Sequence, residues 1–568
     1  MLQWVSKTLT TEEDFQELKK IINKTKRLYG AFDTETTGLN IGLDTPFLFQ
    51  FGFIDEITKL GYTFVVDLEQ QEDYSRQVIT YWHSYAVKLK KYLAHNTKYD
   101  LHMLHNINLD YIANNLSDTQ FYIRYAHDAL TPANGGPPLG LKDYATRYIT
   151  RDAKLFEHEL NREKTAIAKE LNIKLKMRLN TSAKTTKRYT MKSLLDLFKD
   201  PIFTKDDLPE EIKEPYMEWL QNDVPVWLRN KITSIAEADL IPYNKLNRAN
   251  VIKYAHYDII YTLEIFLFLK DAVAARHNER GIEIEEQLIL PFYAMEQTGF
   301  KINKEYLLNA QKKMKTYIIQ EREKLYKLAG QKFAIGQHAF IKDLFKAKYD
   351  IELDTTNKND LDLLHSELIK EGKKEPAEFI EAIQELRTLE KWYSVYITRF
   401  LKDLHNTDKL YTQINQVGTV SGRVTSDFQQ FPSKGVFTKT GEPLFNPREM
   451  VIPEKDGLVY MDYSQIELRF QAFYTILVGH PDLNLCRAYM PYKCVNKQGE
   501  HFDYTNPEHI KNWNKEWYFE EQPDTHWVAT DVHGATTEKA TGLKPTDEGF
   551  ARARKTIGKK VNFAKLNS

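Results

Sequence analysis

Two carboxylates near the N-terminus have the type and spacing of metal ligands. Asp33 and Glu35 stand two residues apart in the segment FDTETTG, at the end of an apolar stretch. Side chains of a strand alternate between the two faces of a sheet, so residues two apart lie on the same face. Two carboxylates on one face repel each other unless a cation lies between them, and hard oxygen ligands suit Mg²⁺ or Mn²⁺. In isolation, the same pair is also typical of a turn or a helix cap.

Two further polar pairs follow, each with helical spacing. Asn96 and Asp100 are four residues apart in AHNTKYDLHML, and Tyr254 and Asp258 are four apart in VIKYAHYDIIYT. Residues at i and i+4 share one face of a helix. Each pair alone is typical of an ordinary polar helix face. The three elements in this order are much less expected by chance.

Together these elements resemble the three motifs of DEDD-type 3′–5′ exonucleases, in the version with a tyrosine in the third motif. The resemblance implies a site for two Mg²⁺ or Mn²⁺ ions, with the ligands Asp33, Glu35, Asp100 and Asp258. One ion would activate the attacking water and the other would stabilise the leaving 3′ oxygen. Tyr254 would orient the water. The segments DTQ (118–120) and GLKDYA (140–145) stand where such domains have their next strand and helix.

The second half of the chain carries a longer motif. LVYMDYSQIELRF resembles motif A of family A DNA polymerases almost letter for letter, and its apolar residues 458–461 predict a buried strand. By this resemblance, Asp462 at the end of the strand binds both catalytic Mg²⁺ ions, and the backbone carbonyl of Tyr463 adds a ligand. Gln465 would contact the substrate. Glu467 would crowd the sugar 2′ position and exclude ribonucleotides.

Two earlier segments resemble the thumb and the primer–template contacts of the same family. FAIGQHAFIKDLF (333–345) resembles the thumb segment, and Glu296 with Gly299 forms the E-x-x-G at the entry to the polymerase region. The segment Ser421-Gly422-Arg423 resembles one that contacts primer–template. Arg423 would reach the minor groove, whose acceptors are similar for every base pair, so that a donor checks geometry without identifying the base.

The last part of the chain resembles the fingers. His533 in TDVHGATTEKATG belongs to a D-x-H element, and ARARKTIGKKVNFA resembles motif B. Lys559 would meet the triphosphate, and Phe563, four residues later, would pack on the incoming nucleotide. Lys555 stands where the family usually has Arg, and an ammonium cannot grip phosphate in a bidentate manner. The neighbouring Arg554 is the candidate substitute.

The chain departs from the family pattern after motif B. The family continues as N-F-G-x-x-Y-G, whereas here Ala564 is followed by KLNS and Asn567 stands at the place of the templating Tyr. Motif C, with its second metal-binding carboxylate, does not follow. We therefore expect a polymerase region that is truncated before motif C, through an intron, an intein, a frameshift or a split into two polypeptides.

Regular elements must position these residues. Residues 28–67 predict strands, 76–105 predict a helix, a short strand and a helix, and 252–275 predict a helix. This mixture is typical of an α/β or α+β domain with a central sheet. Further predictions are amphipathic helices at 304–348 and 376–404, strands at 410–419 and 458–464, and a basic helix at 546–566 opened by Thr546.

A basic block lies between the second and third motifs. Residues 162–192 contain ten Lys or Arg against Glu163 and Glu170, a net charge of +8. Such an excess of positive charge is typical of segments that contact phosphates. A solvated helix and loop is the equal alternative.

Composition excludes several classes of protein. With 42% hydrophobic and 28% charged residues, the 568-residue chain is not disordered or fibrous. The net charge of −1 excludes a global basic field, and two cysteines exclude a disulfide framework. No apolar run approaches the length of a membrane span. We expect a cytoplasmic protein, in the host cytoplasm if it is viral.

The expected architecture is an α/β (α+β) multidomain chain. A ribonuclease H-like exonuclease domain would occupy residues 1–285, with a basic insertion at about 150–250. It would be followed by a thumb at 286–408 and a partial palm and fingers at 409–568, which form an incomplete right-hand polymerase domain.

The resemblance implies a phage-type replicative DNA polymerase with a proofreading exonuclease. Its expected partners are primer–template DNA, deoxynucleoside triphosphates and a C-terminal polymerase fragment or processivity factor. One alternative is an exonuclease with a vestigial polymerase region. The other is a non-catalytic, primer–template-binding replisome subunit.

Overall fold

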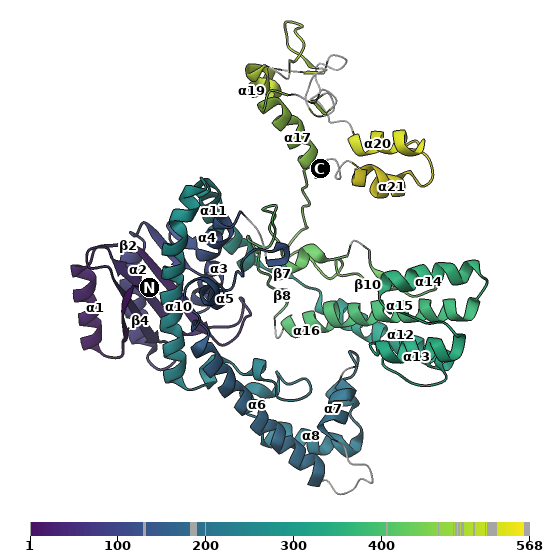
Figure 1. Ribbon diagram of the computed structural model, residues 1–568, viewed down its shortest axis with the longest axis horizontal. Helices are drawn as coiled ribbons and strands as arrows, with labels where there is room; N and C mark the ends of the chain where they lie inside the picture. The colour runs from purple at the N-terminus through teal and green to yellow at the C-terminus, as the bar shows by residue number, and fades with distance from the viewer. Residues whose placement is uncertain are drawn as a thin grey trace. The chain divides into compact units, whose positions relative to one another are not determined.

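The structure is a computed structural model of the chain, and its elements are shown in Figure 1. It describes residues 2–128, 132–181, 190–198, 200–404, 407–432, 434–463, 465–480, 482, 485–486, 489, 494–503, 506–516, 518–519 and 531–561. The chain divides into two compact units, residues 1–457 and 458–568. The fold is mixed α/β and multidomain, as the sequence predicts.

A six-stranded mixed sheet forms the centre of the N-terminal part. Its strands, in the order β1-β4-β3-β2-β5-β6, are β1 (Gln3–Thr8), β4 (Leu60–Asp67), β3 (Pro46–Asp55), β2 (Arg27–Thr36), β5 (Lys91–Ala94) and β6 (Leu116–Asp118). β2, β3 and β4 pair antiparallel, and the other pairs are parallel. The strands predicted over 28–67 and the short strand predicted within 76–105 are confirmed.

Helices cover both faces of this sheet. On one face, Trp82 of α2 (Glu72–Ala86) stacks on Phe51 and Phe53 of β3, with ring centroids 4.8 and 5.6 Å apart. Gly52 lies between these phenylalanines and therefore faces the other way. A Cβ at Gly52 would lie 2.6 Å from Ile259 of α10 (Arg248–Ala275), so α10 packs closely on the opposite face. This explains why β3 is buried along its whole length.

One further helix near the sheet, α3 (Thr97–His105), carries the second motif. The others are α1 (Glu12–Lys24), α4 (Thr119–Ala126), α5 (Leu141–Tyr148) and α11 (Glu279–Thr298). The helices predicted within 76–105 and at 252–275 are confirmed.

The insertion between α5 and α10 is helical and has its own apolar core. Its helices are α6 (Leu155–Thr181), α7 (Met191–Phe198), α8 (Glu210–Asn222) and α9 (Val226–Arg229). Tyr216 and Trp219 of α8 are buried in this core, where the Trp219 indole donates to the carbonyl of Leu171 on α6 at 2.8 Å. The insertion is therefore a folded subdomain over its described residues.

A second helical region follows α11. It contains α12 (Lys304–Ala329), α13 (His338–Tyr349), α14 (Lys358–Lys370), α15 (Lys374–Trp392), a π-helical turn (Tyr393–Thr398) and α16 (Arg399–Leu404). The amphipathic helices predicted at 304–348 and 376–404 are confirmed in type. The first one is broken at Gly330, whose φ of +76° ends α12, because a left-handed residue cannot continue the helix.

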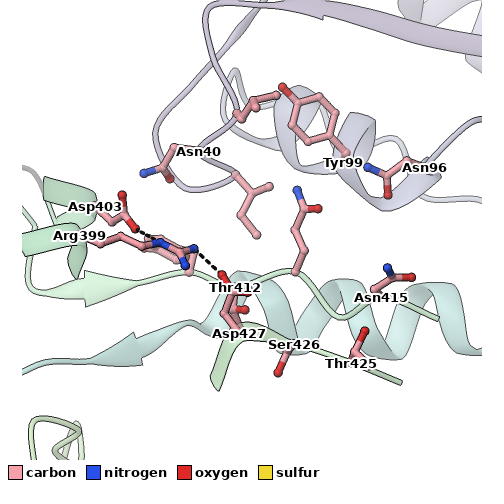
Figure 2. Close-up of a pocket in the computed structure, with 14 residues that line it drawn as sticks. Asn40, Asn96, Tyr99, Arg399, Asp403, Thr412, Asn415, Thr425, Ser426 and Asp427 are labelled. Carbon is pink, nitrogen blue, oxygen red and sulfur yellow. Dashed lines mark hydrogen bonds and ion pairs between the residues drawn. The ribbon is translucent and has the colours of Figure 1, made fainter. Parts of the chain in front are cut away.

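The strand predicted at 410–419 is wrong beyond its first residue. Lys409–Leu410 (β8) pairs with Phe300–Lys301 (β7), and further on Asn415 forms an isolated antiparallel bridge with Thr425. On either side of Asn415, the backbone bonds to buried side chains. The N–H of Ile414 donates to Glu296 at 2.5 Å, and the carbonyl of Gln416 accepts from Arg124 at 2.7 Å. Figure 2 shows Thr412 and Asn415 on this irregular segment. Two short strands, β9 (Val436–Phe437) and β10 (Pro443–Phe445), complete the unit.

The second unit differs from the sequence prediction at two places. Residues 458–461 form no strand and are 66–87% exposed, because no other strand pairs with them within the described chain. The helix expected from Thr546 begins at Phe550, since the backbone N–H of Lys544 donates to the carboxylate of Asp547 at 2.8 Å and closes a turn there.

The elements of the second unit are α17 (Ile466–Leu477), β11 (Cys494–Val495), α19 (Pro507–Glu516), β12 (Tyr518–Phe519), α20 (Val532–Thr541), α21 (Phe550–Ala553) and a π-helical turn (Arg554–Gly558). Among the described residues of both units, no helix is long and apolar enough to span a membrane.

Candidate active site

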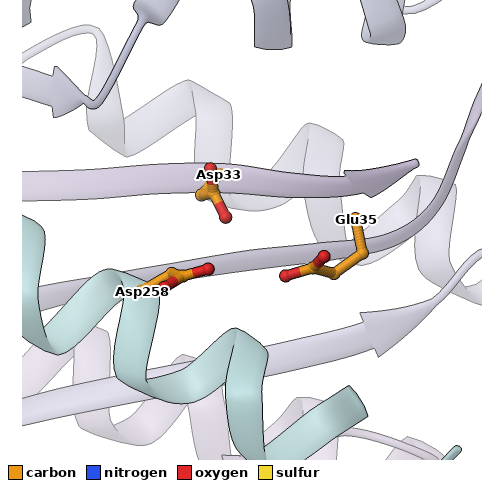
Figure 3. A group of neighbouring side chains, drawn as sticks. All are labelled: Asp33, Glu35 and Asp258. Carbon is orange, nitrogen blue, oxygen red and sulfur yellow. The ribbon is translucent and has the colours of Figure 1, made fainter. Parts of the chain in front are cut away.

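Three of the predicted metal ligands meet above the central sheet. Carboxylate oxygens of Asp33, Glu35 and Asp258 lie within 4.8 Å of one another. Figure 3 shows Asp33 and Glu35 on their strand, β2, facing Asp258 on α10. The arrangement joins the first and third motifs, which are more than 200 residues apart in the sequence.

Strand register explains why these groups converge. Asp33 of β2 is paired with Gln50 of β3, and Ala31 with Gly52. Side chains at paired positions point to the same face, so Asp33, Gln50 and Gly52 all face α10. Because Gly52 has no side chain, Ile259 can approach the sheet closely. Its neighbour Asp258 is thereby brought to the carboxylates of β2.

Because the three carboxylates lie close together at buried or half-buried positions, they can ionise together only if a cation neutralises them. Burial raises the pKa of Asp33 to about 6, and the pKa of Glu35 is raised well above its usual range by burial and by the nearby Asp33. Ionised carboxylates this close together are stable only when positive charge neutralises them. A set of hard oxygen donors in this geometry fits Mg²⁺ or Mn²⁺ better than a thiophilic metal.

The predicted fourth ligand, Asp100, lies outside this group of three. Its carboxylate accepts hydrogen bonds from the backbone N–H and the hydroxyl of Thr34, at 2.9 and 2.6 Å. Burial and the nearby Asp33 raise its pKa well above the usual range. Asp100 is thus buried against the residue of β2 that follows Asp33, and its role as a ligand stays a prediction.

Tyr254 lies one helical turn before Asp258 on α10. Its ring packs edge-on against Tyr243, with centroids 5.5 Å apart. Burial, and then the negative charge of Glu35, raise the pKa of the Tyr254 phenol well above its ordinary value. The hydroxyl therefore keeps its proton and can donate a hydrogen bond to a water or a phosphate oxygen.

Two residues at the cluster have no role in the sequence predictions. Gln50 donates its amide to Asp33 at 2.5 Å and to Glu35 at 3.2 Å. It is the one polar residue before the final Asp in the strand PFLFQFGFID, and this is a signal from which it could be found. Lys142 of α5 ion-pairs with Asp258, and burial lowers its pKa to about 8. Its segment, GLKDYA, predicts a helix but no contact with the carboxylates.

A polar cavity of about 660 Å³ lies beside the second motif (Figure 2). Asn40, Asn96 and Tyr99 line it from the sheet domain, whereas Arg399 and Asp403 line it from the helical region. Further lining residues are Leu39, Ile41, Tyr411, Thr412, Gln413, Asn415, Thr425, Ser426 and Asp427. A smaller cavity of about 210 Å³ shares Asn96, Tyr99, Gln413 and Asn415. Asn96, a residue with left-handed backbone conformation that immediately precedes α3, therefore lines both cavities.

Buried ion pairs fix one wall of the smaller cavity. Lys98 and His102 of α3 donate to Glu296 of α11, at 2.6 and 2.8 Å. Lys98 also donates to the carbonyl of Ile414, whose N–H bonds to Glu296. The segment that precedes Arg423 is thereby held against α3. Glu296, which the sequence marks only as part of E-x-x-G, is the centre of this anchor.

The predicted polymerase residues are divided between the two units. Arg423, in the first unit, is exposed. In the second unit, Asp462 and Tyr463 are exposed. Gln465, which precedes α17, accepts from the hydroxyl of Tyr489 at 2.9 Å. No group of three potential metal ligands in the described chain includes Asp462.

Among the residues predicted to belong to the fingers, Arg554 already forms an ion pair. Arg554 donates two hydrogen bonds of 2.8 Å to Asp531, so its guanidinium is already paired. This pairing makes Arg554 less available to bind phosphate in place of Lys555, and that role stays a prediction. His533 is buried, Lys555 and Lys559 are exposed, and Glu467 lies in the first turn of α17. Phe563 and Asn567 lie outside the described residues.

Part of the basic block is neutralised within the insertion. Arg178 ion-pairs with Glu218 and Asp223 of the insertion, and Lys174 ion-pairs with Glu170. Lys169 and Lys176 are exposed on α6. The block's Lys184, Lys187 and Arg188 lie outside the described residues. The exposed members remain candidates for phosphate contacts.

Comparisons with known proteins relate the chain to DNA polymerases. Residues 304–566 match the model of DNA polymerase family A. DNA polymerase I of Chloroflexus aurantiacus is 27% identical over 320 residues, which cover 54% of this chain and 28% of that protein. DNA polymerase I of Geobacillus stearothermophilus is 30% identical over 204 residues, which cover 35% of this chain and 23% of that protein.

A solved structure also matches. The POL domain of Pol1 from M. smegmatis, in complex with DNA primer–template and dNTP, has a TM-score of 0.48 and 13% identity, covering 85% of this chain and 67% of that one. The chain spans less than a third of the length of the curated relatives that it matches. Over residues 304–566, a little under half of its length, the chain is similar to DNA polymerase family A.

Proposed function

We propose that the chain acts in template-directed DNA synthesis and that its N-terminal domain is a 3′–5′ exonuclease that removes nucleotides from DNA 3′ ends. The exonuclease is the function that the geometry supports best. The observation that carries it is the convergence of Asp33, Glu35 and Asp258 within 4.8 Å on one face of the sheet.

The residues of the cluster divide the work. Asp33, Glu35 and Asp258, together with Asp100, would hold two Mg²⁺ or Mn²⁺ ions, which supply charge stabilisation and activation of water. Gln50 fixes the orientation of two of these carboxylates through its amide. Tyr254 would hold the attacking water by hydrogen bonding, for which its retained proton suits it.

The adjacent cavity suits the unpaired 3′ end of a DNA strand. Its amides can hydrogen-bond to base edges, and Tyr99 and Tyr411 can stack on bases, as in other single-strand sites. Arg399 is paired with Asp403 and Asp427, so its charge is not available for phosphates. The cavity is therefore better suited to bind bases than the backbone.

The match of residues 304–566 to DNA polymerase family A supports a polymerase role for the second half. Asp462 of motif A would bind the Mg²⁺ ions of nucleotide addition, and the substrates would be primer–template DNA and deoxynucleoside triphosphates. The two alternatives are an exonuclease whose polymerase region is vestigial and a non-catalytic subunit that binds primer–template. The acidic cluster favours an enzyme over the non-catalytic subunit.

The decisive experiment is digestion of 5′-labelled single-stranded DNA by the purified chain with Mg²⁺. We expect a ladder that shortens from the 3′ end, and its loss in the double variant Asp33→Ala, Glu35→Ala. The matched control is Glu13→Ala with Asp73→Ala, two exposed carboxylates in the same domain, which should digest normally. Unimpaired digestion by the cluster variant would refute the assignment.

Primer extension separates the remaining alternatives. Extension that is abolished in Asp462→Ala would establish the polymerase. Digestion without extension would favour the vestigial region, and DNA binding without either activity would favour the non-catalytic subunit.

A further inference from the structure

A buried lysine lies inside the carboxylate cluster. Lys142, on α5, is 8% exposed, and its ammonium contacts the carboxylate of Asp258. The same ammonium lies 4.3 Å from the ring centroid of Tyr254 and 5.1 Å from that of Tyr261. Positions 254, 258 and 261 form one stripe along α10, so the whole stripe faces the lysine.

Burial of this ammonium requires the carboxylates. Removing a charged amine from water is costly unless an opposite charge compensates it. Asp258 is the ion-pair partner, and Asp33 and Glu35 also attract the ammonium electrostatically. The two tyrosine rings add a weaker cation–π attraction. The lysine and the carboxylates therefore hold one another in place.

We propose that Lys142 is a positioning residue that serves as the internal cation of the exonuclease metal site. Its ammonium stands among the oxygens that would bind metal, keeps the carboxylates together before metal arrives, and must leave Asp258 when a divalent ion enters. Lys142 therefore competes with the metal. The inference rests on the proposed function, because it takes the cluster to be a metal site.

Lys142 could have either of two roles, and metal affinity distinguishes them. If Lys142 only connects α5 to α10, its replacement should lower stability and leave metal affinity unaltered. A competing cation must oppose metal binding, because two positive charges within a few ångströms repel each other. Metal affinity, measured without any DNA, distinguishes the two.

The experiment is titration of the full chain with Mn²⁺, with free Mn²⁺ followed by electron paramagnetic resonance. The site of interest is the binding that disappears in Asp33→Asn. At this site we expect Lys142→Gln to bind Mn²⁺ about tenfold more tightly than the parent chain, since a unit charge next to the ion has been removed. In EDTA the same variant should have a lower Tm. Lys142→Arg, which keeps the charge, should not bind more tightly.

Control variants make the result specific. Lys154→Gln removes a lysine that pairs with the exposed Asp143 and not with a carboxylate of the cluster, and should leave Mn²⁺ affinity unchanged. If Lys142→Gln does not fold, Lys142→Met keeps the aliphatic length and replaces it in the titration.

The outcomes separate this inference from the proposed function. Unchanged or weaker Mn²⁺ binding at the Asp33-dependent site of the Lys142 variant would overturn the inference alone. Mn²⁺ binding that does not depend on Asp33 would overturn both. Tighter Mn²⁺ binding without any digestion of DNA would support the inference and leave the exonuclease assignment refuted.

Discussion

Arg322 of α12 donates hydrogen bonds of 2.5 and 2.8 Å to the two carboxylate oxygens of Asp200, which lies 122 residues earlier, in the insertion. The same guanidinium donates to Glu390 of α15 at 2.7 and 3.0 Å. Ile202, two residues after Asp200, is buried in the apolar core of the helical region. The insertion that leaves the sheet domain at α6 is thus fastened to the helices that follow α11.

This connection predicts where the chain loses stability. Ile202→Ala should cost about 2–4 kcal/mol of the free energy of unfolding, because it empties a buried site. Asp200→Ala should cost about 1–2 kcal/mol, since Asp200 is partly exposed and Arg322 keeps Glu390. Urea denaturation measures both effects, and limited proteolysis should show earlier cleavage in the insertion. Asp206→Ala, an exposed neighbour, is the control; equal effects in all three variants would contradict the connection.

Gly52 should be required for the metal site although it carries no functional group. A Cβ there would lie 2.6 Å from Ile259 and 2.4 Å from the carbonyl oxygen of Tyr62. Gly52→Val should move α10 away from the sheet, cost about 1–3 kcal/mol of stability by overpacking, and weaken Mn²⁺ binding because Asp258 moves with the helix. Mn²⁺ titration and thermal unfolding check this. Gly336→Ala, where a Cβ meets no atom within 4 Å, should change neither.

His256 should make stability fall in acid. Burial lowers its pKa to about 4, and Nδ1 lies 2.9 Å from the hydroxyl of Thr63. Between the ordinary pKa of about 6.5 and pH 4 the unfolded chain binds the proton and the folded chain does not, so stability drops as pH falls. The full effect is about 3 kcal/mol.

The measurement is urea denaturation at several pH values for the parent chain and for His256→Phe. The variant should lose less stability between pH 7 and pH 4. The comparison isolates His256, because groups with a raised pKa, such as Asp33, act with the opposite sign in both proteins. Parallel pH profiles would show that His256 is protonated in the folded chain as readily as in the unfolded one.

The exposed part of the basic block should contact DNA phosphates. Replacing Arg162, Lys169 and Lys176 with Gln should flatten the log–log salt dependence of single-strand binding by about 0.7 for each phosphate that the chain no longer neutralises. Fluorescence anisotropy at several salt concentrations measures the slope. Lys174→Gln, whose lysine pairs with Glu170, is the control and should change the slope less. An unchanged slope in the triple variant would identify the block as a solvated surface.

The sequence alone determined the features that depend on neighbouring residues. Alternation along β2 places Asp33 and Glu35 on one face, and helical spacing places Tyr254 and Asp258 on one face of α10. Both patterns are local, because strand and helix periods are set by the backbone. Motif A likewise identified the family from contiguous residues. None of these patterns specifies a distance between elements.

Tertiary structure decided what those faces meet. Gly52 lets α10 approach the sheet, which brings Asp258 to Asp33, and the register of β3 adds Gln50. The apolar residues 458–461 are exposed because burial of a strand requires a partner elsewhere in the fold. The segment at 411–417 forms no continuous strand, and Glu296 and Arg124, both distant in sequence, bond its backbone. Each of these outcomes depends on non-local contacts, and a periodic pattern in the sequence carries no record of them.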